Sequence, residues 1–188
     1  MGRNELTQAV HDNLRNLKLD VLDVVNLRSM LGDAMPTEGS LEEPLNVIAD
    51  LQRQGLIRHV GLSSVTPSQV MQGRSICNVV CVQNLYNLSD RGDASLVQDF
   101  AKNKIAYVAY FPLGGLSFVQ SAVLSRIAGE LGAKPVQVAL AWLLQHAPNI
   151  LPIPGTSSLT HLRQNIDAAA LTLSPSAIAE LDAVDHAR

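Results

Sequence analysis

The 188 residues fit one domain, and 47% hydrophobic with 16% charged residues is typical of a globular chain with a sizeable core. The formal net charge of -3 is spread without long runs, so the sequence lacks the basic face that nucleic-acid binding needs. The start of the chain has no secretory apolar segment, and no uninterrupted apolar run approaches about 18 residues. These features predict a soluble, cytoplasmic protein without a membrane span.

The two cysteines, Cys77 and Cys81, have the spacing of neither a CxxC pair nor half of a zinc ribbon. Both lie in or beside an apolar run that is typical of a strand. We therefore expect buried thiols in a reducing compartment and no metal site.

The chain begins with a predicted helix over about residues 5 to 17, in which Leu and Val recur at three- and four-residue steps. Asn4 is predicted to cap this helix. The run Leu19–Leu27 is dense in Val and Leu, which predicts a strand buried on both faces, with Arg28 just past its end.

Strands and helices then alternate to the C-terminus. Ser40 and Glu43 predict a capping box for a second helix, which ends at Gly55. Further strands are predicted at His59–Ser64, Val79–Asn84, Ile105–Phe111 and from Ile150 onward. Further helices are predicted from Thr66-Pro67 and Asp93, and over about Ser121–Leu131, Pro135–His146, Ser158–Ala168 and Pro175–Val184. Trp142, with apolar neighbours at helical spacing, is predicted to pack in the core. This alternation indicates a parallel sheet with right-handed crossovers.

Polar residues follow the predicted strands at their C-terminal ends. They are Arg28, Ser63 and Ser64, Gln83 and Asn84, Tyr110, and Gly155 to Ser158. Each has a structural explanation of its own, as a helix cap, a buried amide, a core ring or a surface ion pair. Parallel sheets bind ligands beyond these strand ends, so the collected set predicts a ligand site.

The stretch Ile150–Asn165 reads as a strand, a turn and the start of a helix. Free N–H groups at a helix start favour an anion, and Thr156, Ser157 and Ser158 add hydroxyl donors, so phosphate is one predicted ligand. The alternative is that Ser157 or Ser158 caps the helix. The residues alone leave both interpretations open.

The ordered motifs resemble those of the aldo-keto reductase family along nearly the whole chain. They are LKLDVLDVVNL, HVGLSS, CVQNLYN, AYFPLGG, PVQVALAWLL and ILPIPGTSSLTHLRQN, followed by LSPSAIAELDAV. The resemblance implies an α/β fold, a (β/α)8 TIM barrel of which this chain supplies about the last five strands with their helices. We therefore expect residues 1–188 to form the C-terminal part of a barrel domain. An open edge on each side of five strands would favour self-association.

The resemblance also implies binding of NADP(H) across the C-terminal strand ends and hydride transfer to a small aldehyde or ketone. It assigns the nicotinamide carboxamide to Ser63, Ser64 and Gln83. It assigns the rest of the cofactor to Tyr110 at the nicotinamide ring, Leu113 and Gly114 at the pyrophosphate, Gly155, Thr156, Ser157 and Ser158 at the 2′-phosphate, and Gln164 and Asn165 near the adenine.

Three positions depart from the family pattern. Ser64 stands where most members have Asn, His161 where many have the Arg that grips the 2′-phosphate, and Leu85 replaces a common acidic residue. Cofactor binding is therefore a firmer expectation than a preference for NADP over NAD.

The family's catalytic set is an Asp, a Tyr that donates the proton, a Lys and a His. Arg28 stands at the His position, and the other three belong to the first three barrel strands, which the motifs of this chain do not include. Arg28 could still polarise a carbonyl oxygen as a cationic donor.

Three functions remain open at this point. The first is part of an NADP(H)-dependent reductase of aldehydes or ketones, with pyridoxal suggested because the motifs are most similar to those of bacterial pyridoxal reductases. The second is a non-catalytic binding or interaction module derived from the same family. A fragment of a phosphate-binding barrel isomerase or lyase is the third, and the FPLGG and CVQN motifs argue against it.

Overall fold

The computed structural model describes residues 2–32, 35–114 and 121–184. The chain divides into two compact units, Met1–Gln83 and Asn84–Arg188. Five strands form one sheet in the order β1-β2-β3-β4-β5, and the pairs β1–β2, β2–β3 and β4–β5 are parallel. The predicted series of five strands in sequence order is confirmed.

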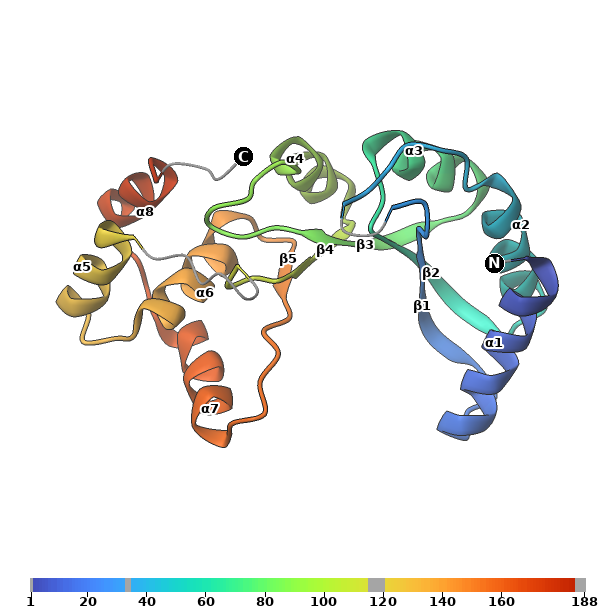
Figure 1. The fold of residues 1–188 in the computed structure, drawn as a ribbon, viewed down its shortest axis with the longest axis horizontal. Coiled ribbons are helices and arrows are strands. Elements are labelled where there is room, and N and C mark those ends of the chain that lie inside the picture. The colour runs from blue at the N-terminus through green and yellow to red at the C-terminus, as the bar shows by residue number, and fades with distance from the viewer. Residues whose placement is uncertain (1, 33–34, 115–120, 185–188) are drawn as a thin grey trace. The chain divides into compact units, whose positions relative to one another are not determined.

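The first unit contains three helices and the first strands. Its elements are α1 (Arg3–Leu17), β1 (Leu22–Arg28), α2 (Glu42–Arg53), β2 (Ile57–Ser63), α3 (Pro67–Ile76) and most of β3 (Val79–Leu85). Figure 1 shows α1, α2 and α3 on one side of β1 and β2. The helix α2 contacts both strands and both other helices, and it buries Leu45, Val47, Ile48 and Leu51 in the core.

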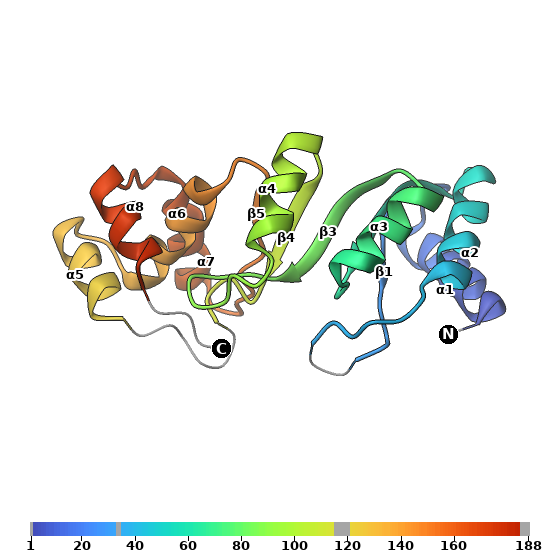
Figure 2. The same cartoon turned by 90° about the horizontal axis from the view of Figure 1, so that it is seen from above.

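The second unit is organised around one helix. Its elements are α4 (Ala94–Asn103), β4 (Ala106–Tyr110), α5 (Ala122–Glu130), α6 (Pro135–His146), β5 (Ile150–Pro152), α7 (Leu159–Asp167), the 3-10 turn η1 (Ala168–Ala170) and α8 (Pro175–Asp182). The helix α6 contacts α5, α7, α8, η1 and β5, and Figure 2 shows α4 beside β4. None of the described helices is long and apolar enough to cross a membrane.

Trp142 on α6 is fully buried, which confirms its predicted packing role. Its indole N–H donates to Asp182 Oδ1 at 2.8 Å, and the guanidinium of Arg91 lies 4.7 Å from the ring centroid. The hydrogen bond joins α6 to α8, and the Arg91 contact joins α6 to the loop before α4.

Two predicted helix starts are wrong. The first helix is capped by Gly2 instead of Asn4, because the Glu5 carboxylate reaches back to the Gly2 N–H at 2.8 Å. The capping box of Ser40 and Glu43 does not form. Leu41 is the N-cap residue of α2 and makes no side-chain cap. Its N–H donates to Gln72 Oε1 of α3 at 2.7 Å, and Ser40 Oγ accepts from the Glu42 N–H at 3.2 Å.

The apolar sequence of β1 predicted a strand buried on both faces, and this prediction is wrong. Val24 in its middle is 50% exposed, although Leu22 and Leu27 are buried. The strand is the first in the sheet order, and the described helices of this unit pack on one side of it. Its Val and Leu content reflects strand propensity as much as burial.

Candidate functional site

The register of the sheet aligns three predicted site residues in the first unit. Arg28 pairs with Ser63, and Ser63 pairs with Gln83. Paired residues of neighbouring strands project from the same face of a sheet. The structure therefore brings these three side chains together at the C-terminal ends of β1, β2 and β3.

The backbone around Ser63 and Ser64 is tightly held. The Ser29 N–H donates to the Ser63 carbonyl at 2.8 Å, and the Ser64 N–H donates to the Gln83 carbonyl at 3.0 Å. Ser64 adopts the left-handed conformation with φ of 54°, so the chain turns sharply out of β2. Both serines are buried, and the backbone hydrogen bonds fix the main-chain positions from which their side chains extend.

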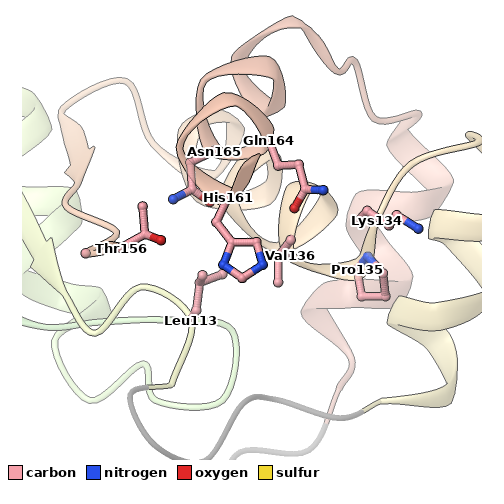
Figure 3. A pocket seen from close by; sticks show the side chains of 9 residues that line it. Leu113, Lys134, Pro135, Val136, Thr156, His161, Gln164 and Asn165 are labelled. Atoms are coloured by element: carbon pink, nitrogen blue, oxygen red, sulfur yellow. The ribbon is translucent and has the colours of Figure 1, made fainter. Parts of the chain in front are cut away.

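A groove runs along the loops of the second unit. Its first part, of about 490 Å³, is lined by Tyr110, Phe111, Pro112, Leu113, Ile153, Pro154 and Gly155. Its second part, of about 430 Å³, is lined by Leu113, Lys134, Pro135, Val136, Gly155, Thr156, His161, Gln164 and Asn165 (Figure 3). The two parts share Leu113 and Gly155, so they form one elongated groove. Six of the predicted cofactor residues of this unit line it, namely Tyr110, Leu113, Gly155, Thr156, Gln164 and Asn165.

The first part of the groove is shaped by a turn after β4. Phe111 adopts the left-handed conformation with φ of 47°, and Gly114 has φ of 85°. The Phe111 carbonyl accepts hydrogen bonds from the Asn87 side chain at 3.1 Å and from the Gly114 N–H at 2.9 Å. The ring edge of Tyr110 lies against Phe111, with centroids 5.4 Å apart. Gly115, the last residue of the FPLGG motif, lies outside the described residues.

The loop after β5 shows which of the two serines, Ser157 or Ser158, caps α7. Ser158 Oγ accepts from the His161 N–H at 3.4 Å, so Ser158 caps α7. Thr156 Oγ1 accepts from the Ser158 N–H at 3.1 Å and can still donate its own proton. Ser157 is exposed and takes no part in this cap. The cap uses Ser158 Oγ as an acceptor, so all three hydroxyl groups keep a proton that they can donate.

The helix α7 presents three polar side chains to the groove. His161, Gln164 and Asn165 share one helix face because they are three and four positions apart. Figure 3 shows His161 in the middle of the cavity, between Thr156 on one side and Val136 of α6 on the other. The Gln137 side chain donates to the Gln164 carbonyl at 3.2 Å and ties α6 to this helix.

Two of the chain's three tyrosines are buried in the second unit. Tyr86 Oη lies 2.9 Å from His146 Nε2, and burial raises the pKa of Tyr86 to about 12. Tyr107 donates to Asp93 Oδ2 at 2.9 Å, and burial raises the pKa of this phenol as well, with the Asp93 charge adding to the effect. Both groups are weaker acids than a free phenol.

Among the described residues, no group of three or more His, Cys, Asp or Glu side chains is arranged to hold a metal ion. Burial raises the pKa of both thiols, Cys77 and Cys81, which favours the uncharged form that does not bind metals.

The aldo/keto reductase family model matches residues 1–186.

The chain belongs to the aldo/keto reductase family.

Two curated relatives cover most of the chain. It is 58% identical to pyridoxine 4-dehydrogenase of Escherichia coli over 183 residues, which are 97% of this chain and 64% of that protein. It is 34% identical to an uncharacterized oxidoreductase of Schizosaccharomyces pombe, over 94% of this chain and 56% of that protein. The chain thus spans less than two thirds of the length of these relatives.

Solved structures of the family have the same fold. A thermostable aldo-keto reductase in complex with the inhibitor epalrestat superposes with a TM-score of 0.83 at 33% identity, over 96% of this chain and 66% of that one. An aldo-keto reductase from Klebsiella pneumoniae in complex with NADPH gives 0.79 at 26% identity, over 94% of this chain and 63% of that one. The predicted α/β aldo-keto reductase fold is confirmed.

Some residues of this aldo-keto reductase site were missed by the sequence analysis. Phe111, Lys134 and Val136 line the groove, and Asn26 contacts Gln83. Phe111 and Asn26 carried a signal, since one follows a strand within a Pro and Gly loop and the other is a polar residue within an apolar strand. Lys134 and Val136 carried no such signal. They lie at the start of α6, and nothing in the sequence indicates that this helix start lies beside the loops that line the groove.

Proposed function

We propose that this chain forms the NADP(H)-binding part of an oxidoreductase that reduces aldehydes or ketones. The groove from Tyr110 through Leu113 and Gly155 to Asn165 carries this proposal, because a dinucleotide in an extended conformation needs a long site with an anion-binding end. The complex of the Klebsiella pneumoniae relative with NADPH supports the choice of cofactor.

The residues at the far end of the groove fit a phosphate. Thr156 and Ser157 provide hydroxyl donors at the start of α7, where the helix dipole favours negative charge. A Cβ atom built on Gly155 has no heavy atom of the described residues within 4 Å, its chain neighbours aside, so this position leaves room for a ligand. Gln164 and Asn165 supply amide groups that can pair with the edge of an adenine.

The nicotinamide end has a matching set of groups. Ser63, Ser64 and Gln83 would hold the carboxamide through their hydroxyl and amide groups, and Tyr110 would lie against the ring. The bound cofactor would supply the hydride. Arg28 beside Ser63 would donate hydrogen bonds to the carbonyl oxygen of the substrate and stabilise the negative charge that develops there.

Proton donation is the step for which the described residues include no prepared group. Arg28 is assigned to hydrogen bonds with the substrate oxygen and not to proton donation. Tyr86 and Tyr107 have raised pKa values and are bonded to His146 and Asp93. We propose that the five strands are part of an eight-stranded barrel whose other strands carry the donor, and the greater length of the relatives supports this.

Pyridoxal is the proposed substrate, because the chain is 58% identical to a pyridoxine 4-dehydrogenase. The free thiols of Cys77 and Cys81 support a cytoplasmic location.

The test has two parts. Titration of the purified chain with NADPH, followed by fluorescence, should give saturable binding, and the absence of binding would refute the proposed function. NADPH oxidation with pyridoxal should be slower by about two to four orders of magnitude, the value of general acid catalysis, in this chain than in a version that carries the proposed further strands. Equal turnover by the two would mean that a donor lies within this chain, and Tyr86→Phe would be the first variant to test. Binding without turnover in both would favour a non-catalytic module.

A further inference from the structure

A second layer of side chains lies directly beneath the layer of Arg28, Ser63 and Gln83. The register pairs Asn26 with Gly61 and Gly61 with Cys81, on the same face of the sheet. A Cβ atom on Gly61 would lie 1.9 Å from Asn26 Oδ1 and 2.5 Å from Cys81 Sγ. The side chains of β1 and β3 therefore meet over the glycine of β2, and its lack of a side chain is what allows this.

Asn26 links the two layers by hydrogen bonds. The Cys81 thiol donates to Asn26 Oδ1 at 3.3 Å, and Asn26 Nδ2 donates to Gln83 Oε1 at 3.2 Å. Because the thiol supplies the donor at one end of the Asn26 amide, the amide nitrogen faces Gln83. Burial raises the pKa of the Cys81 thiol, which keeps its proton in place.

This arrangement determines whether the oxygen or the nitrogen of the Gln83 side-chain amide is available to a ligand. Its Oε1 is engaged by Asn26, so its Nε2 remains as the donor group beside Ser63. A primary carboxamide on a ligand has one carbonyl oxygen, and an amide N–H at a fixed position selects the orientation in which that oxygen faces it.

We propose that Asn26 is a positioning residue that sets the orientation of the Gln83 amide, and through it the orientation of the nicotinamide carboxamide. The inference rests on the proposed cofactor role of Gln83. Asn26 itself acts one hydrogen bond away from the ligand, in a relay from Cys81 through Asn26 to Gln83.

Asn26→Asp is the sharpest test, because the two side chains have the same shape. A carboxylate accepts from Cys81 but cannot donate to Gln83, so the Gln83 amide must turn its nitrogen toward Asp and present its oxygen to the ligand. We expect NADPH affinity, measured by fluorescence titration, to fall about 5- to 10-fold, the range for one lost hydrogen bond.

Adenosine 2′,5′-bisphosphate is the internal control ligand, since it carries the adenosine and phosphate end without the nicotinamide. Its affinity should stay within about twofold of the unsubstituted chain. Asn13→Asp on α1 is the matched control variant, because it adds the same charge to the same unit at an exposed asparagine that donates to the Ala9 carbonyl. It should leave both affinities unchanged.

Cys81→Ser gives a second measurement. A hydroxyl still donates to Asn26 Oδ1, so NADPH affinity should be retained, whereas Cys81→Ala removes the donor and should lower it.

The outcomes separate the two proposals. Normal NADPH affinity in Asn26→Asp would overturn the positioning role while the proposed cofactor site stands. An equal loss of both ligands would also overturn it, because Asn26 would then act through the fold. Failure of the unsubstituted chain to bind NADPH would remove the cofactor site itself, and the positioning role with it.

Discussion

A Cβ atom on Gly61, within β2, would lie 1.9 Å from Asn26 Oδ1, whereas at Gly155 the same atom meets no described heavy atom beyond its chain neighbours within 4 Å. The first glycine lies in a packed layer where neighbouring strands hold the candidate carboxamide-binding groups. The second lies in an exposed loop whose hydroxyl groups are the proposed hydrogen-bond donors to the cofactor phosphate. One region is preformed by the sheet and the other is open. Substitutions in the packed region should therefore change stability and binding together, and those in the open loop should change binding alone.

Gly61→Ala should have the largest effect on stability. The added methyl group must displace Asn26 or Cys81, and overpacking of this kind costs about 1–3 kcal/mol in the free energy of unfolding. Thermal or urea unfolding measures the loss, and Gly155→Ala is the matched control that should unfold like the unsubstituted chain. Equal unfolding midpoints for the two variants would contradict the difference between the regions.

Gly155→Asp should have the largest effect on binding alone. The new carboxylate would lie where the phosphate of the cofactor is proposed to bind, and repulsion at a surface site is expected to lower NADPH affinity about tenfold. Fluorescence titration gives the affinity and a melting curve checks the fold. The neutral Gly155→Ala should bind normally, and unchanged binding by the Asp variant would remove the phosphate anchor from this loop.

The serines before α7 should divide into two roles. Ser158→Ala removes the cap on the His161 N–H and should lower the free energy of unfolding by about 1 kcal/mol. Ser157→Ala should leave stability unchanged and weaken NADPH binding, because its exposed hydroxyl is a proposed phosphate donor. Melting curves and titrations of both variants would separate these effects. A stability loss in Ser157→Ala would show that the open loop is more tightly built than its exposure suggests.

The core of the second unit offers a smaller, pH-dependent comparison. Burial lowers the pKa of His146, whose Nε2 faces Tyr86 and whose Nδ1 lies 3.7 Å from Asp182, with Arg91 also near. The folded state thus holds a proton less readily than the unfolded one. Neutral His146 therefore makes its full contribution to the free energy of unfolding above about pH 6.5, the ordinary pKa of histidine. This contribution is lost as the pH falls below that value.

The measurement is the melting temperature between pH 7.5 and 5.5, in the unsubstituted chain and in His146→Gln. The decrease toward acid pH should be shallower in the variant, and by less than the effect of Gly61→Ala. Parallel curves would assign the acid sensitivity to other groups.

Features set within one helical turn could be predicted from the sequence. The helix α6 was predicted over Pro135–His146 and has these bounds, because a proline at the first position and an apolar stripe are local signals. The start of α3 at Thr66-Pro67 was predicted as well, and the Thr66 side chain forms a capping box with Gln69. Five strands in order were readable for the same reason, since each is a short apolar run between turn residues.

Contacts between distant parts of the chain were decided by the tertiary structure alone. The Leu41 N–H before α2 donates to Gln72, 31 residues away, and the partner of Gln83 is Asn26, 57 residues away. The sequence of β1 determined that Asn26 would lie in a strand, and the motif CVQN marked Gln83 as a candidate. That the two amides meet depends on the lateral register of β1, β2 and β3 and on the space above Gly61. Hydrogen bonds within a turn depend on residues that are close in sequence and can be predicted from them. The register of a parallel sheet is set only when its helices have packed and aligned the strands.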